Sequence, residues 1–188
     1  DLACLYRTEE RSRDAYDLLY FAYCLYHADD LVRARCLAEF ADCIRNLPQN
    51  TNASRRKILK KASDMISQAE SICRSHSTEP QHRNVLMMIL DTQLLVQLDR
   101  LELESETRLD HFYQEAMNTQ KRAMALQMEL GEASPEFQEC KLHRSKIHYV
   151  KGQLLRNHPD PTRENQRKTC LELAKQDQTD VLMSLTKG

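Results

Sequence analysis

Cysteines and histidines are the first residues in this sequence whose types and spacing suggest chemistry. Cys73 and His76 lie three positions apart, Cys140 and His143 repeat that spacing, and each pair is followed by a further histidine. Residues three apart share one face of a helix, so two such pairs would build a Cys₂His₂ zinc site if their helices met. The pairs are distant in the sequence and no Cys-x-x-Cys occurs. We therefore expect core cysteines, solvent-facing histidines and no metal.

Other catalytic patterns are weak. Seven cysteines and seven histidines permit many nucleophile–base pairs on paper, so the existence of one indicates nothing. Neither of the glycine-rich phosphate loops, G-x-G-x-x-G and G-x-x-x-x-G-K, occurs. Neighbouring carboxylates such as Asp29 and Asp30 fall in a predicted turn, where they are normally solvated. We expect no enzyme active site and no cofactor.

Basic residues gather in two places. One cluster opens the segment 53–75 and consists of Arg55, Arg56, Lys57, Lys60 and Lys61. A second follows the segment 135–157, where we expect partner-binding residues at Lys141, Arg144, Lys146, His148 and Lys151. Such patches are either ordinary solvated faces or a groove that attracts an acidic peptide of a partner protein. The net charge of −1 and the few aromatics among them disfavour a nucleic-acid backbone.

Tyrosines form a further cluster near the start of the chain. Tyr16, Tyr20, Tyr23 and Tyr26 follow one another at spacings of four and three, down one side of a helix. They are either core residues, which need partners for their hydroxyls, or amphipathic rings of an interface. Tyr16, Tyr20 and Tyr23 are our additional candidates for contact with a partner.

The elements that must position these residues are all helical. The chain has 188 residues but only three glycines, which disfavours hairpins and bulges, and leucine outnumbers valine and isoleucine together. Prolines at 48, 80, 135, 159 and 161 lie between periodic segments or in a first turn. About seven antiparallel helices are predicted, at 2–27, 30–47, 53–75, 81–105, 107–130, 135–157 and 161–185.

Three features refine this prediction. The segment 81–105 is apolar on most of its circumference, so we expect it to be covered on both sides. Asn52 and Ser134 are expected helix caps, Asp160-Pro161 repeats the cap-then-proline device of Ser134-Pro135, and Gly131 is an expected left-handed stop. No run approaches the roughly 20 apolar residues of a membrane span.

Two stretches resemble tetratricopeptide repeats. From Leu18 to Asn46, small residues such as Ala34, Ala38 and Ala41 follow an aromatic-rich helix, and the stretch 112–131 is similar to a repeat's second helix. The diagnostic tryptophan is absent and the helices exceed the regular unit. The resemblance implies an α-α superhelix, or α-solenoid, that binds other proteins. An irregular helical array or bundle is the alternative.

The cysteines bear on the compartment. Seven is an odd number, and most of the seven lie in apolar helical stretches, so we interpret them as reduced, buried thiols. That interpretation predicts an intracellular protein, cytoplasmic or nuclear. The chain opens on Asp1 without an initiator methionine or signal-peptide layout, and we expect residues 1–188 to be one helical-repeat domain cut from a longer polypeptide.

The sequence thus predicts a non-enzymatic scaffold that presents a helical surface to another protein, to an acidic peptide, or to flanking domains of its own chain. One alternative is a structural or regulatory solenoid segment of a larger protein such as a protease or a kinase. A zinc or thiol enzyme is the third class.

Overall fold

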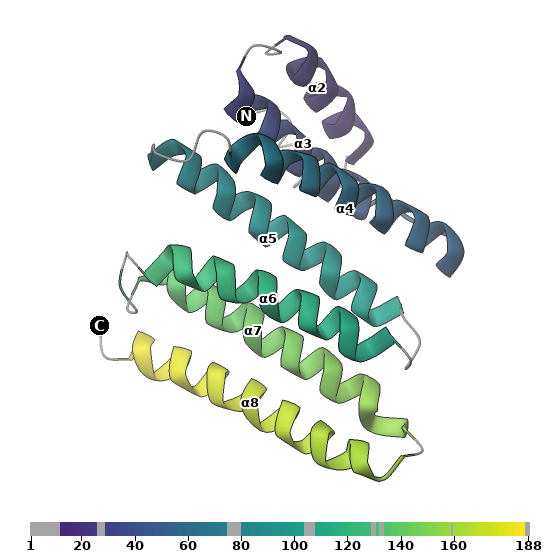
Figure 1. The fold of residues 1–188 in the computed structure, drawn as a ribbon, viewed down its shortest axis with the longest axis vertical. Helices are drawn as coiled ribbons and strands as arrows, with labels where there is room; N and C mark the ends of the chain where they lie inside the picture. The colour runs from purple at the N-terminus through teal and green to yellow at the C-terminus, as the bar shows by residue number, and fades with distance from the viewer. Residues whose placement is uncertain are drawn as a thin grey trace. The chain divides into compact units, whose positions relative to one another are not determined.

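The computed structural model describes residues 12–25, 29–74, 80–103, 108–128, 131, 134–158 and 160–186. These residues form seven α-helices and a short 3₁₀ segment, with no strand among them (Figure 1). The helices are α2 (Ser12–Leu25), α3 (Asp30–Arg45), α4 (Asn52–Arg74), α5 (Pro80–Leu103), α6 (Leu109–Gln127), α7 (Pro135–Leu154) and α8 (Thr162–Leu185), with η3 (Leu155–Asn157) after α7. The all-α prediction is confirmed, and the described part of each predicted segment holds one helix. The predicted start of the first helix at residue 2 lies outside the described residues.

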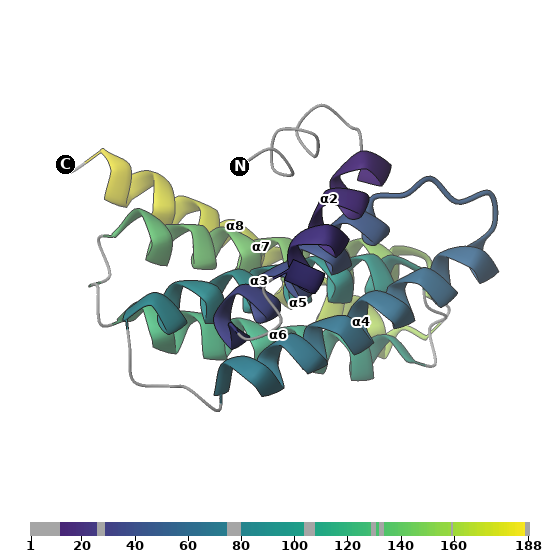
Figure 2. The same cartoon turned by 90° about the horizontal axis from the view of Figure 1, so that it is seen from above.

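The chain divides into two compact units, and the division falls within α5. Unit 1 ends at Val96 and unit 2 begins at Gln97. In unit 1, α2 packs on α3 and α3 packs on α4. In unit 2, α6 packs on α7 and α7 packs on α8, and these three consecutive helices run in alternating directions (Figures 1 and 2). Packing therefore joins mostly neighbours in the sequence.

Helix ends follow the expected chemistry with two corrections. At α8 the cap-then-proline device is not reproduced, because Pro161 itself is the N-cap, although the Asp160 carboxylate accepts from the Thr162 amide at 2.9 Å. The Ser134 hydroxyl accepts a hydrogen bond from the Phe137 amide at 3.2 Å, with proline at the next position, as predicted. Gly131 has a φ of +93°, the conformation that favours glycine, shortly after α6 ends. The cap predicted at Asn52 is wrong. Thr51 caps α4 instead, because its hydroxyl accepts from the Ser54 amide at 3.1 Å.

The core of unit 1 is built from small side chains and one large ring. Ala34, Ala38 and Ala41 of α3 are fully buried, which lets the neighbouring backbones approach closely. The fully or almost fully buried residues of α4 recur at three- and four-residue spacing and are Leu59, Ala62, Ile66, Ala69 and Cys73. On the α2 side, Phe40 fills the space between the helices. The amphipathic pattern thus accounts for both contacts of α3.

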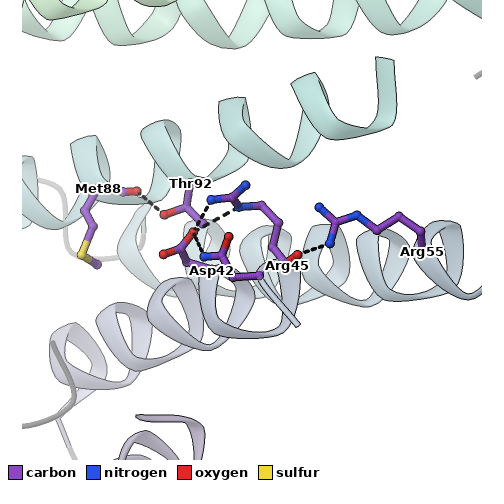
Figure 3. Close-up of polar contacts among 6 residues, drawn as sticks. Asp42, Arg45, Arg55, Met88 and Thr92 are labelled. Atoms are coloured by element: carbon purple, nitrogen blue, oxygen red, sulfur yellow. Dashed lines mark hydrogen bonds and ion pairs between the residues drawn. The ribbon is translucent and has the colours of Figure 1, made fainter. Parts of the chain in front are cut away.

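A polar contact fixes the turn between α3 and α4. The guanidinium of Arg55 donates to the backbone carbonyl of Arg45 (Figure 3). That carbonyl lies at the C-terminal end of α3, where the helix dipole is negative and a cation is favourable. Arg45 in turn donates to the Asp42 carboxylate at 2.9 and 3.1 Å (Figure 3). The loop 46–51 is therefore held between two helix ends.

The helix α5 is buried on more than one face, as its apolar composition predicts. Ile89, Leu90, Leu94 and Val96 are almost completely buried, and so are Leu98 and Leu101 beyond the unit boundary. These positions include neighbours in the sequence, which point to different sides of a helix. Even Thr92 is buried, and its hydroxyl donates to the Met88 carbonyl at 2.9 Å (Figure 3).

In unit 2, α7 and α8 approach closely at a glycine. A Cβ atom added to Gly152 would lie 2.8 Å from the Leu171 side chain, so only glycine fits there without rearrangement. The Ser145 hydroxyl donates to the Ala174 carbonyl at 2.9 Å, within the buried contact of the two helices. Small residues therefore set the helix separation in this unit as well.

Candidate interaction surfaces

The three candidate tyrosines divide between the interior and the surface of unit 1. The Tyr16 ring packs on Phe40 with ring centroids 4.9 Å apart, and the Tyr23 ring lies 6.2 Å from it. The Tyr23 hydroxyl also accepts from Arg33 at 3.3 Å. Tyr20, by contrast, is 59% exposed. Tyr16 and Tyr23 are thus partly core residues, whereas Tyr20 lies on the outer side of α2. Tyr26 falls outside the described residues.

Beside Tyr20, α2 exposes two more large apolar side chains. Phe21 is 63% and Leu25 is 58% exposed, and the two lie one helical turn apart. We call Tyr20, Phe21 and Leu25 the α2 outer patch. The opposite side of the same helix is buried through Ala15 and Leu19. The helix α2 therefore has apolar surface on both sides, and only one side is covered by the described part of unit 1.

Tyr16 also lines an apolar groove of about 550 Å³. It is lined by Tyr16 and Asp17 of α2, by Ile44 of α3, by loop residues 47–49 and by Lys61 of α4. We call it the α2–α4 groove. Its volume falls within the range of pockets that hold a ligand or an anchoring side chain. Because three elements and a loop contribute, the linear sequence gives no signal for it beyond Tyr16 and Lys61.

The α4 lysine cluster comprises Lys57, Lys60 and Lys61. All three side chains are exposed, and none makes an ion pair within the described part of the chain. They lie at spacings that place them on one side of the first half of α4. The basic opening of this helix, noted in the sequence, is therefore a solvent-facing positive surface, apart from Arg55, which contacts the end of α3.

The predicted basic surface of α7 is not one exposed face. Lys151 and His148 are buried, and Arg144 is half-buried. Lys146 is exposed and Lys141 is half-buried, with its ammonium 5.6 Å from the Phe137 ring. The expectation of a continuous surface is wrong for Arg144, His148 and Lys151. These residues follow the buried Cys140 at three- and four-residue steps, so they lie on the same inner side of α7. The general expectation of solvent-facing histidines is likewise wrong for His148.

The inward-facing residues of α7 form a polar network with α6 and α8. Arg144 makes a two-pronged ion pair with Asp177 of α8, with N–O distances of 2.5 and 2.9 Å. The Lys151 ammonium lies 2.8 Å from the Asp110 carboxylate of α6 and 3.9 Å from the centre of the Tyr113 ring. Between the two cations, a 2.9 Å hydrogen bond joins the Tyr113 hydroxyl to His148 Nδ1. These contacts join α6, α7 and α8.

The network shifts the titration of its members. Burial lowers the pKa of His148, and the nearby cations Arg144 and Lys151 lower it further, while Asp177 opposes them. Burial also raises the pKa of Tyr113 to about 12. The hydrogen bond from Lys151 lowers the pKa of Asp110. A neutral His148 and a neutral Tyr113 flanked by paired charges are typical of a structural polar core.

The outer side of α7 retains a mixed surface. Lys146 is flanked one turn away on each side by Leu142 and Tyr149, which are 45% and 50% exposed. We call these three residues the α7 outer stripe. It is the part of the predicted α7 surface that faces solvent.

The cysteines and the candidate metal ligands can be judged only within the described residues. Six of the seven cysteines are described, none of these is in a disulfide, and all but Cys24 are buried. Burial raises the pKa of the Cys36, Cys73 and Cys170 thiols, which makes them poor nucleophiles. No group of three or more histidine, cysteine or acidic side chains in the described ranges is arranged to hold a metal ion. The Cys73 thiol instead contacts the His82 carbonyl at 3.5 Å.

Comparison with known proteins adds no assignment. The chain matches no protein-family model, no curated protein and no solved structure. Among the described helices, none has the length and apolar character that crossing a membrane requires. Within the described residues, fold and surface show an all-helical protein with exposed apolar side chains, a groove and a cluster of exposed lysines.

Proposed function

We propose that this chain is a non-enzymatic protein-interaction module, a tetratricopeptide-like helical array that binds a segment of a partner protein through unit 1. The α2 outer patch and the α2–α4 groove provide the contact area. The exposed Lys146 and the half-buried Lys141 of α7 are a secondary contact. The helical framework acts passively, since rigid helices present their side chains without the entropic cost of ordering a loop.

The observation that carries the proposal is the exposure of the α2 outer patch. Tyr20, Phe21 and Leu25 are all more than half exposed on one short helix. Large aromatic residues are enriched where proteins bind one another, because they bury much area with little loss of conformational freedom. The helix α2 already covers the core of unit 1 with its other side, so stability of the fold does not explain the outer side.

The test is affinity capture with a variant whose patch is polar. The double variant Tyr20→Ser/Phe21→Ser removes two exposed rings and leaves Ala15 and Leu19 in place. Proteins captured from a cell lysate by the original chain and by the variant are quantified side by side by mass spectrometry. We expect at least one protein whose capture falls about tenfold or more, since anchoring aromatics contribute on the order of 2 kcal/mol each.

A matched control keeps this test specific. Leu182→Ser/Leu185→Ser likewise removes two exposed apolar side chains, on α8, where these residues are 64% and 69% exposed. Capture of the relevant protein should be unchanged in the control, and far-ultraviolet circular dichroism should match the original chain in both variants. Two outcomes would contradict the proposal: every captured protein is lost to the same extent in both variants, or no captured protein is lost in either variant.

The same α8 residues favour a second candidate function, a structural segment of a larger helical protein. Leu182, Met183 and Leu185 expose apolar surface at the end of α8. A segment that packs against further helices would associate with itself through such a surface. Sedimentation velocity at increasing concentration should then show association that Leu182→Ser/Leu185→Ser abolishes. A monomer at all concentrations would exclude this candidate.

A further inference from the structure

The α2–α4 groove and the α4 lysine cluster share a residue. Lys61 lines the groove and also belongs to the cluster, so an occupant of the groove contacts Lys61, and Lys57 and Lys60 lie within one turn of it on α4. The groove itself is mostly apolar through Ile44, Leu47 and Pro48. A ligand that fits both features must therefore combine an apolar group with negative charge.

The charge around the groove has one dominant sign. Between Asn52 and Asp64, α4 carries five basic residues and a single acid, Asp64. The N-terminal end of the helix adds the positive end of its dipole to the same region. The exposed lysines of the cluster have no ion pair among the described residues. A concentrated positive surface of this kind attracts carboxylates and raises their association rate.

We propose that this combined site binds an acidic linear segment of a partner protein, with one large apolar side chain in the groove and flanking carboxylates on the lysine cluster. The inference rests on the proposed function and names the chemistry of the partner. Two properties of the site must be used together. The groove supplies burial and register, whereas the lysines select for acidic neighbours of the anchoring side chain.

Asp17 makes the proposal sharper, because it is a charge of the opposite sign on the lining of the same groove. It is exposed, and it repels an acidic segment. Its neutralisation should therefore strengthen the binding that loss of the lysines weakens. A variant pair with opposite effects cannot be explained by partial unfolding, which weakens binding in every variant.

The first measurement is a selection from a display library of random 12-residue peptides against the 188-residue chain. We expect enriched peptides to share one large apolar residue with aspartate or glutamate within a few positions of it. Enrichment of neutral or basic peptides would overturn the proposal, and so would a selection that enriches nothing.

The second measurement places the selected peptide on the site. Its dissociation constant is measured by fluorescence anisotropy with the original chain and with Lys60→Glu/Lys61→Glu. Two exposed ion pairs contribute little individually, but reversal also adds repulsion, so we expect weakening of about 10- to 30-fold. The control Lys121→Glu/Lys175→Glu changes the net charge by the same amount at exposed positions of α6 and α8. It should weaken binding less than about twofold, because exposed charges at a distance are screened.

The third variant removes the acid from the groove. Asp17→Asn should strengthen binding of the same peptide about two- to threefold.

The outcomes separate this inference from the function on which it rests. A peptide that binds equally to the original chain and to Lys60→Glu/Lys61→Glu overturns the site while leaving a protein-interaction module intact. Failure of both the peptide selection and the patch-dependent capture overturns both. A single-stranded RNA of 12 nucleotides is the second probe. If it competes with the peptide and binds the lysine cluster as tightly, the assignment to an acidic protein segment is wrong.

Discussion

In unit 1, alanines and one phenylalanine fill the contacts of α3, whereas in unit 2 the contacts of α7 add ion pairs and hydrogen bonds to the buried apolar and small residues. In unit 1, Ala34, Ala38 and Phe40 occupy the contacts of α3. In unit 2, Arg144 of α7 pairs with Asp177 of α8. On its other side, α7 contacts the polar side chains of Asp110 and Tyr113 of α6. Both units are built from adjacent helices that pack in pairs, so the difference lies in the side chains between them.

The difference decides where the basic residues of each unit are found. Unit 2 uses Arg144 and Lys151 inside its helix contacts, and this removes them from the surface. Among the described residues of unit 1, the acid Glu39 is buried but no basic side chain is, and the α4 lysine cluster remains exposed. Two segments that look equally basic in the sequence thus give a structural network in one unit and an exposed positive surface in the other.

The largest expected effect concerns the apolar core of unit 1. Phe40→Ala should lower the free energy of unfolding by about 3–5 kcal/mol, because Phe40 is buried and two tyrosine rings pack on it. Urea unfolding followed by circular dichroism measures the change. The matched control is Phe21→Ala on the exposed side of α2, which should stay within about 0.5 kcal/mol. Equal losses in the two variants would contradict the two-sided description of α2.

The next effect concerns the ion pair of unit 2. Asp177→Asn leaves the Arg144 guanidinium without its buried counter-charge and should cost about 1–3 kcal/mol. Asp180→Asn, an exposed change on the same helix, is the control. The double variant Arg144→Met/Asp177→Leu should recover most of the loss, since apolar residues of similar size replace a buried pair at little cost. If the double variant is less stable than Asp177→Asn, apolar residues cannot replace the ion pair, and this expectation is contradicted.

Much of the fold could be predicted from local sequence. Prolines and capping residues such as Ser134 mark the helix starts, and three- and four-residue spacing of apolar groups marks the buried side of α4. These signals act within one or two turns, so one chain segment contains them completely. The cap at Thr51 was missed because Asn52 is an equally good capping residue one position further on.

The sites were less predictable, because they depend on partners distant in the sequence. Arg144, His148 and Lys151 look like a basic surface when they are judged by residue type alone. Their spacing from the buried Cys140 was the available signal that they continue the inner side of α7. Asp177, which accepts Arg144, lies 33 positions away and on another helix. Which acid meets which base is fixed only by tertiary packing.

A pH dependence should distinguish the two units. The pKa of His148 is lowered in the folded chain, so the unfolded chain takes up a proton there first as the pH falls below about 6.5. The stability that depends on a neutral His148 is therefore present above that pH and is lost below it, with a slope of up to about 1.4 kcal/mol per pH unit. The pKa of Asp110 is also lowered, and the stability that its ionised carboxylate contributes is lost only below about pH 4. Asp110 therefore does not cause a change of stability near pH 6.

The measurement is urea unfolding between pH 5 and pH 7.5 with His148→Gln. This variant should lose most of the slope, although Tyr113, Arg144, Lys151 and Asp177 still face the position. His111→Gln changes an exposed histidine of the same unit and should keep the slope. A slope that survives in His148→Gln would assign the proton uptake to another group.

The smallest effect compares one tyrosine hydroxyl from each unit. Tyr113→Phe removes the 2.9 Å hydrogen bond to the buried His148 and should lower the free energy of unfolding by about 1 kcal/mol. Tyr23→Phe removes a longer bond to a half-buried Arg33 and should cost less than half of that.

Unfolding at alkaline pH then separates loss of the hydrogen bond from loss of packing. Because burial raises the pKa of Tyr113 to about 12, the folded chain holds this proton while the unfolded chain releases it near pH 10. Stability should therefore fall between pH 10 and pH 12 in the original chain and fall less in Tyr113→Phe, which has no proton to release. Tyr23→Phe should follow the original chain, and if it shows the same flattening as Tyr113→Phe, the polar network of unit 2 is not the source of the alkaline loss.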